Sequence, residues 1–282
     1  MLSFIIKTIL FQQPWAIAIL LSDELHCSGS ILSEKYVLTA AHCFHRLDET
    51  KMNIIAGSDD PANSIPEKKR NLVQKKKIDN VKIHPLYENP AARYDLAIVK
   101  IKGQFMFRNS RWPICIPEET RSREFHFSKG YSLVGFGRDL NLDNRGSVLT
   151  TLDLDVQPTV ACSSQYAEIL NNERDDQHFR LKNTLPKNFD EDSLLCASKP
   201  GRSSGSCPGD SGGIFMRNEY VSDLNDYRNI QTAVVHGAVQ KCNGGRYPPI
   251  FVRIDTDEAL PWINSIAFPT TTKTPAYRAI GK

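Results

Sequence analysis

The chain has 282 residues, of which 40% are hydrophobic and 24% charged, and its formal net charge is +3. This length and composition exclude disorder as the main state and allow one large all-β domain or two smaller ones. The net charge is too small to argue for a nucleic-acid partner, and the charged residues do not lie along any one helical face.

The first 20 residues are apolar enough to raise the question of a signal peptide or a membrane span. Lys7 and Pro14 interrupt the apolar run, and the small residues Ala16 and Ala18 lie inside a predicted strand. The uninterrupted apolar pieces are too short to cross a membrane. We therefore expect residues 1–12 to be an atypical or truncated N-terminal segment, and we expect no membrane partner.

Apolar runs bounded by polar residues predict three strands early in the chain, which span residues 13–20, 27–32 and 36–39. A polar turn at residues 22–24 joins the first two. The third strand runs into His42, and a lone histidine at such a position is usually a core or surface residue.

Farther on, Asp95 opens an otherwise apolar strand. A carboxylate that enters a core needs a hydrogen bond or a charge partner, so we expect Asp95 to pair with His42.

Two basic clusters, residues 68–70 and 75–77, lie between His42 and Asp95. Such runs are usually solvated loop faces, and the alternative is a site for an anionic partner on a basic loop at residues 68–77. Because Glu67 is the only carboxylate among the clusters, a calcium loop is not expected.

The second half of the chain predicts another β unit, which begins near residues 133–138 and ends with a strand at residues 249–254. A polar surface loop interrupts this unit and carries a short helix at residues 162–170. A closing helix at residues 257–263 follows the last strand, with Thr256 or Asp255 as its cap.

The stretch at residues 206–213, Ser-Cys-Pro-Gly-Asp-Ser-Gly-Gly, sets Ser211 among glycines and beside a carboxylate. Glycines on both sides of a hydroxyl suit a tight turn whose backbone N–H groups point at the atom that the hydroxyl attacks. The alternative is an ordinary surface turn of Gly, Ser and Asp. A candidate base and a candidate acid elsewhere in the chain favour the nucleophile.

With the motifs at residues 39–43, 95–98 and 209–213, the chain resembles the trypsin/chymotrypsin-like serine proteases, whose triad follows the order His, Asp, Ser. The resemblance covers roughly residues 13–266. It implies an all-β fold of two six-stranded antiparallel Greek-key β-barrels packed together, with a C-terminal α-helix. We expect the protease domain at residues 13–267, divided into barrels at about 13–130 and 131–267, and a Thr/Pro-rich tail at residues 268–282.

The resemblance implies that His42 is the general base, that Asp95 orients its imidazole and that Ser211 is the nucleophile. The N–H groups of Gly209 and Ser211 would form the oxyanion hole. The residues of the substrate site would be Gly205, His236, Gly237 and Ala238. The substrate is then a protein or peptide, and no cofactor is expected.

The motif around Ser211 also fits the nucleophile turn of α/β-hydrolases. In that fold the acid and the histidine follow the serine, which leaves Asp223 or Asp226 with His236. These residues crowd into a short span, and the chain lacks alternating long helices. We therefore prefer the two-barrel interpretation.

Seven cysteines without C-x-x-C spacing indicate disulfides rather than metal ligands, and hence an oxidising compartment. The pairings carried over from the family are Cys27–Cys43, Cys162–Cys196 and Cys207–Cys242. Cys115 is left over. In many relatives the matching cysteine tethers the protease domain to an upstream propeptide, which implies a missing N-terminal part here.

The sequence departs from the family at its start. The family's mature chain begins with Ile or Val, then Val or Ile and two glycines, and its amine pairs with the aspartate before the nucleophile, here Asp210. No Gly-Gly follows Ile5 and Ile6. We therefore expect a truncated or mispredicted start, a differently satisfied Asp210 and an oxyanion hole that can stay unformed.

The specificity pocket departs as well. Gly205 occupies the position where trypsin-like relatives carry an aspartate, so cleavage after basic residues is not implied. Pro249 replaces a pocket-wall glycine, which predicts a narrow pocket for small or medium apolar residues. His236 replaces a serine whose hydroxyl commonly supports the buried acid. Two hypotheses follow: a secreted, extracellular serine endopeptidase made as a zymogen, and a non-catalytic homologue that binds a partner.

Overall fold

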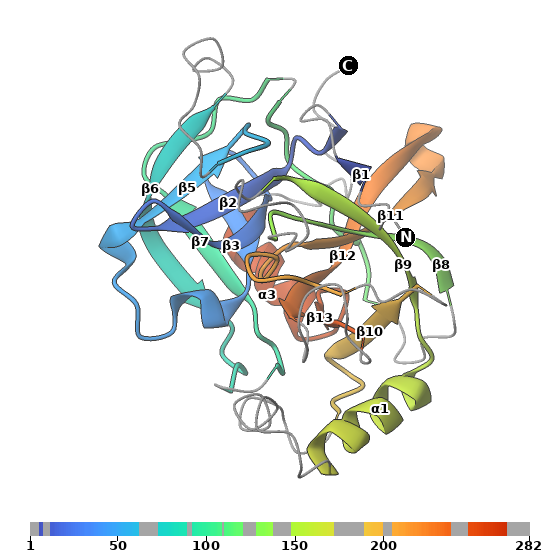
Figure 1. Cartoon of the computed structure of the whole chain (residues 1–282). Coiled ribbons are helices and arrows are strands. Elements are labelled where there is room, and N and C mark those ends of the chain that lie inside the picture. The colour runs from blue at the N-terminus through green and yellow to red at the C-terminus, as the bar shows by residue number, and fades with distance from the viewer. Residues whose placement is uncertain are drawn as a thin grey trace.

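The computed structural model describes residues 6–7, 12–61, 73–88, 92–108, 110–120, 128–137, 148–171, 189–199, 205–237 and 248–269. Strands dominate this part of the chain (Figure 1). The strands are β1 (Ile6–Lys7), β2 (Ala16–Leu21), β3 (Glu24–Ile31), β4 (Tyr36–Thr39), β5 (Met52–Ala56), β6 (Gln74–Ile83), β7 (Ala97–Ile101), β8 (Ser128–Gly135), β9 (Thr150–Val156), β10 (Leu194–Ser198), β11 (Ile214–Val221), β12 (Asp226–Gly237) and β13 (Ile250–Arg253). The described helices are α1 (Thr159–Asn171) and α3 (Ala259–Ala267).

The first barrel closes in the strand order β2-β3-β4-β7-β6-β5, with antiparallel neighbours throughout. Its β2–β3 hairpin turns at Ser22 and Asp23, whose φ angles of 52° and 68° match a two-residue turn that follows the strand twist. This turn lies within the predicted one. Ile17 and Ile19 on β2 are fully buried, so the hairpin supplies the barrel with core side chains.

The second barrel contains β8, β9, β10, β13, β12 and β11, and it closes because β8 pairs with both β9 and β11. The short strand β1 adds to β9 through the pairs Ile6–Thr151 and Lys7–Thr150. The predicted architecture of two six-stranded antiparallel barrels is therefore confirmed.

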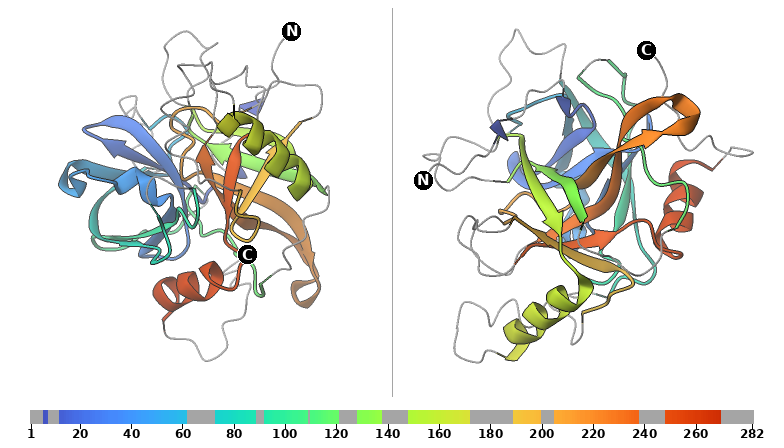
Figure 2. Two further views of the ribbon diagram at one scale, coloured as in Figure 1. Left: turned by 90° about the horizontal axis from the view of Figure 1, so that it is seen from below. Right: turned by 90° about the vertical axis from the view of Figure 1, so that its right-hand side faces the viewer.

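The two barrels lie side by side, with the blue and cyan strands on one side and the green to orange strands on the other (Figure 2). One apolar core extends across both, because buried residues of the first barrel such as Ile17 cluster with Val134 and Val234 of the second. A buried hydrogen bond from Ser30 Oγ to Gln231 Oε1, 2.6 Å long, also crosses the boundary. This shared packing fixes the barrels relative to each other, and residues at their boundary can form one site.

The closing helix α3 lies beneath the first barrel in the left-hand view of Figure 2 and contacts β7. The N-cap of this helix is Glu258, whose side chain makes no capping hydrogen bond. In the turn just before the helix, Thr256 Oγ1 accepts a hydrogen bond of 3.0 Å from the N–H of Ala259. The predicted caps, Thr256 and Asp255, are therefore wrong, because the helix begins two residues later than predicted. Helix α1 starts earlier than the predicted helix at residues 162–170. None of the described helices has the length and apolarity needed to span a membrane.

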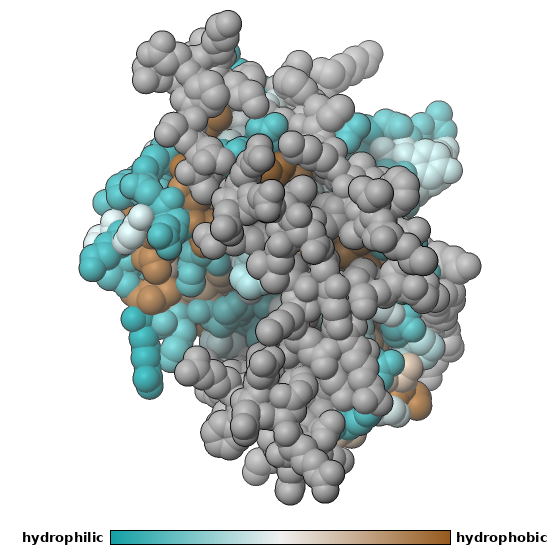
Figure 3. Space-filling view, in the orientation of Figure 1, coloured by the Kyte–Doolittle hydropathy of each residue, from teal (hydrophilic) through white to brown (hydrophobic). Residues whose placement is uncertain are grey.

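The second basic cluster lies on strand β6 rather than on a loop, which corrects the prediction of a basic loop. The Lys75 ammonium forms an ion pair of 2.8 Å with Asp23, and Lys77 donates to the carbonyl of Thr50. Hydrophilic side chains cover much of the edge of the molecule where β5 and β6 lie (Figure 3). The cluster at residues 68–70 lies outside the described residues, so an anionic partner for residues 68–77 stays a prediction.

Candidate active site

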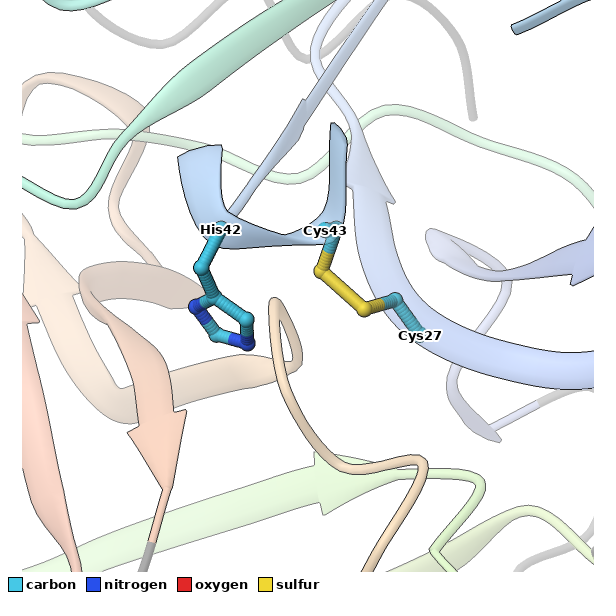
Figure 4. Close-up of side chains that lie close together, drawn as sticks. All are labelled: Cys27, His42 and Cys43. Carbon is cyan, nitrogen blue, oxygen red and sulfur yellow. A yellow bond between two sulfur atoms is a disulfide. The ribbon is translucent and has the colours of Figure 1, made fainter. Parts of the chain in front are cut away.

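His42 lies in a short 3₁₀ turn, Ala41–Phe44, that directly follows β4. The next residue, Cys43, forms a disulfide with Cys27 of β3, with the two Cα atoms 6.3 Å apart (Figure 4). The cross-link fixes the turn on the neighbouring strand, and the His42 imidazole leaves the turn in a different direction from the disulfide. The backbone that carries the candidate base is therefore held rigidly.

Asp95 is fully buried, and it contacts His42 through both carboxylate oxygens. Its Oδ2 lies 2.5 Å from Nδ1 of the imidazole, and its Oδ1 accepts a 2.7 Å hydrogen bond from the backbone N–H of His42. A carboxylate can only accept, so Nδ1 carries the proton of the first bond. The pairing that the sequence predicted is present.

The backbone before Asp95 is strained. Tyr94 is buried and has a φ of 48°, a left-handed conformation that residues other than glycine rarely adopt. Its ring stacks on His84 with the centroids 4.8 Å apart, and this packing holds the conformation. We interpret the strained residue as a device that directs Asp95 toward His42.

The electrostatics of the pair follow from burial and contact. Burial of Asp95 raises its pKa, but the adjacent His42 charge and the hydrogen bonds from His236 and His42 outweigh this effect and hold the pKa well below its usual range. Burial also lowers the pKa of His42, and the Asp95 charge and hydrogen bond more than offset it, so the pKa lies above 6.5. Asp95 thus stabilises the protonated imidazole that a general base becomes.

Ser211 lies in a loop that is pressed against the first barrel. Gly212, with φ at 80°, has no room for a side chain, because a Cβ there would lie 2.1 Å from Thr39 Oγ1. The N–H of Ser28 donates a 2.7 Å hydrogen bond to the Ser211 carbonyl, and the N–H of Gly212 donates to Val235. Residues of both barrels therefore hold the Ser211 loop in place, next to the end of β4, which His42 follows.

The Ser211 hydroxyl donates its hydrogen bond, 3.3 Å long, to the backbone carbonyl of His236. Between the described residues Ser211 and His42 there is no hydrogen bond in this conformation. Catalytic hydrogen bonds are often long or misaligned without substrate, and in this conformation the Ser211 hydroxyl bonds to a carbonyl rather than to the imidazole.

His236, at the end of β12, contributes a contact that sequence reasoning missed. Its Nδ1 donates a 2.6 Å hydrogen bond to Asp95 Oδ2, the same oxygen that accepts from His42. The replacement of the usual serine hydroxyl therefore does not leave the acid unsupported, because an imidazole takes its place. The two rings meet edge to face with the centroids 5.3 Å apart. The signal available in the sequence was a histidine in the strand that borders the predicted substrate site.

Asp210 is buried beneath the same loop. Its carboxylate accepts hydrogen bonds from the backbone N–H groups of Gly137, at 2.7 Å, and Cys207, at 2.8 Å. Burial raises the pKa of Asp210 to about 6, even though both hydrogen bonds lower it. Among the described residues, no cationic side chain forms an ion pair with Asp210. Two backbone amides thus provide hydrogen bonds to the Asp210 carboxylate, for which the family uses the amine of the mature chain start.

The predicted substrate and oxyanion residues are only partly described. Gly205 and Gly237 are half-buried, Gly209 has a φ of 102°, and Pro249 is buried. Ala238 lies outside the described residues, so the predicted narrow pocket stays a prediction.

The cysteines agree with the predicted pairings where they are described. Cys27–Cys43 and Cys162–Cys196 are both disulfides. Cys207 is disulfide-bonded as well, while its predicted partner Cys242 lies outside the described residues. Cys115 is a free, half-buried thiol whose pKa is raised by burial.

Comparisons with known proteins extend this picture. The family model described as Trypsin matches residues 9–263. The chain is 29% identical over 208 residues to Ovochymase-2 of Mus musculus, covering 72% of this chain and 30% of that protein. It is 26% identical over 233 residues to Venom serine protease Bi-VSP of Bombus ignitus, covering 81% and 56%. It is 27% identical over 249 residues to Serine protease grass of Drosophila melanogaster, covering 84% and 59%. The chain thus spans between 30% and 59% of the length of these relatives.

Proposed function

The chain belongs to the trypsin family of serine proteases, and we propose that it is a secreted serine endopeptidase in which His42, Asp95 and Ser211 act as the triad. The observation that carries the proposal is the contact between His42 Nδ1 and the fully buried Asp95 Oδ2, at 2.5 Å. A histidine with that partner is oriented as a base, and the family match supplies the reaction class.

The reaction follows from these side chains. As the Ser211 oxygen attacks the carbonyl carbon of a peptide bond, its proton passes to Nε2 of His42, and Asp95 stabilises the imidazolium. The N–H groups of Gly209 and Ser211 stabilise the negative oxygen of the tetrahedral intermediate. His42 then returns the proton to the leaving amine, and water hydrolyses the acyl-enzyme. Rotation of the Ser211 hydroxyl away from the His236 carbonyl begins the cycle.

We further propose that the enzyme is made as a zymogen. The support is Asp210, a buried carboxylate with a pKa of about 6 and two backbone amides as partners. A carboxylate in this state gains stability from a cation, and in the family a newly formed chain end supplies one. The free thiol of Cys115 suits a tether to an upstream segment.

Secretion into an extracellular, oxidising compartment is proposed because five of the six described cysteines are disulfide-bonded. The substrate is a protein or peptide. Gly205 offers no negative charge to a basic side chain, so we propose cleavage after small or medium apolar residues.

A second candidate function is a non-catalytic homologue that binds a partner. The hydrogen bond from Ser211 to the His236 carbonyl favours it, because the hydroxyl in this conformation does not engage the base. A fluorophosphonate probe separates the candidates, since it reacts only with an activated serine. We expect labelling of correctly processed, folded protein and its loss in Ser211→Ala. Folded wild-type protein that stays unlabelled would leave only the homologue.

A further inference from the structure

Two imidazoles converge on one buried carboxylate oxygen, and the three residues come from distant segments of the chain. His42 comes from the turn after β4, Asp95 from the segment before β7, and His236 from the end of β12. Both imidazole Nδ1 atoms lie within 2.6 Å of Asp95 Oδ2. One ligand atom of each residue lies within 4.8 Å of those of the other two. We propose that these residues form a binding site for a divalent transition-metal ion such as Zn²⁺, and that the bound ion switches off Ser211.

The donor set matches this class of ion. Two imidazoles and one carboxylate are typical ligands of zinc and related first-row metals, while calcium and magnesium prefer oxygen ligands alone. Three protein ligands leave a fourth position for water. Sequence motifs for metal sites rely on ligands that are close together in the chain. They miss this site, because His236 and Asp95 are 141 residues apart.

A backbone hydrogen bond already orients the Asp95 carboxylate, as metal-binding carboxylates usually require. Asp95 Oδ1 accepts from the backbone N–H of His42 at 2.7 Å, so Oδ2 can turn toward an ion while the other oxygen stays anchored. Asp95 is fully buried, but the side chains of His42 and His236 are 31% and 15% exposed. An ion can therefore approach from the side of the imidazoles.

The site must widen slightly to admit the ion. Ligand atoms that each lie about 2.1 Å from a tetrahedral zinc are about 3.4 Å apart, against the present 2.5 and 2.6 Å. Movement of under about 1 Å by two partly exposed imidazoles provides this space. Binding replaces two shared protons: each Nδ1 releases its proton to solvent and donates its lone pair to the ion.

The consequence for the serine follows from the two nitrogens of one ring. When Nδ1 of His42 binds the ion, the remaining proton of the neutral ring is on Nε2. Nε2 then cannot accept the proton of Ser211. This consequence rests on the proposed protease function, whereas the binding of the ion does not.

A neighbouring group of possible ligands does not compete. Cys27, His42 and Cys43 also lie within 4.8 Å of one another, but the two sulfur atoms are joined in a disulfide (Figure 4). Only a thiolate binds a metal strongly, so these sulfurs offer no ligand.

The binding experiment uses the folded, tag-free Ser211→Ala protein, so that neither autolysis nor a lack of activity affects it. Zn²⁺ is titrated by calorimetry, and Co²⁺ by its visible absorption. We expect one ion per chain, binding at least about 10-fold weaker in His236→Ser and unchanged affinity in His45→Ser, which removes an exposed histidine near the site. The absence of stoichiometric binding, or equal binding in His236→Ser, would overturn the proposal.

Two further measurements test the position of the ion and its effect on Ser211. Anomalous scattering at the zinc edge from a soaked crystal of the Ser211→Ala protein should give a peak between His42, Asp95 and His236, and a peak elsewhere would refute the assignment even if His236→Ser fails to fold. Probe labelling of the Ser211-containing protein should fall with added Zn²⁺, relative to each variant's own metal-free rate. Binding without such a fall would disprove the switch alone, and no labelling without metal would disprove the protease function alone.

Discussion

The charge state of Asp210 should control the stability of this protein between about pH 4 and pH 7. The pKa of Asp210 is raised from 3.8 to about 6 because the carboxyl group is buried. As the pH rises through this interval, the unfolded chain loses the proton first, so the folded state becomes less stable. At about 1.4 kcal/mol per pH unit, the interval corresponds to about 3 kcal/mol.

Other groups act elsewhere on the pH scale. The pKa of Asp95 is lowered, so the stability that Asp95 contributes is present above pH 3.8 and is lost only in stronger acid. The pKa of His42 is raised, so its contribution is complete below pH 6.5 and is lost above it. Burial lowers the pKa of His84, so the folded state is less stable below pH 6.5 and gains stability as the pH rises toward that value. In the wild type this gain partly masks the loss of stability that Asp210 causes.

Because other groups also titrate, the assay compares the stability of the parent protein with that of a variant that lacks the Asp210 carboxyl group. Urea unfolding of Asp210→Asn and of the parent, both in a Ser211→Ala background with disulfides intact, gives the free energy of unfolding from pH 4 to pH 7. We expect the parent to lose about 3 kcal/mol relative to the variant over this range. Asp257→Asn, at an exposed position, controls for the change in net charge. A difference that does not vary with pH would refute the argument, and one of opposite sign would mean that a cation already pairs with Asp210.

Three further predictions concern the same site. Gly137→Ala would put a Cβ 2.2 Å from Asp210 Oδ2, so we expect about 1–3 kcal/mol lower stability in urea and loss of fluorophosphonate labelling; a variant with unchanged stability and labelling would contradict the packing. The acid limb of kcat/KM should lie above pH 6.5, because His42 must be neutral to act as a base and its pKa is raised; a limb below pH 6 in peptide hydrolysis would argue against the pairing. Replacing Cys27 and Cys43 together by serine should cost about 3 kcal/mol, since the disulfide joins residues 16 apart; an unchanged thermal unfolding temperature would disprove this.

The three residues of the candidate triad could be selected from the sequence because each motif is local. The apolar run before His42 and the glycines around Ser211 are visible within a few residues, and the order of the motifs along the chain matches one family. The polar turn at Ser22 and Asp23 follows the same rule, since short-range backbone chemistry decides its conformation.

The contacts around the candidate triad were not predictable, because they join segments far apart in sequence. The hydrogen bond between Gly137 and Asp210 spans 73 residues, and the one between His236 and Asp95 spans 141. The packing of the two barrels brings His236 to Asp95, and the folding of the second barrel brings Gly137 to Asp210. No local pattern encodes either contact. The sequence by itself determined which chemical groups are present and which family they match. Only the tertiary structure decided that an imidazole supports the buried acid and that backbone amides hold Asp210.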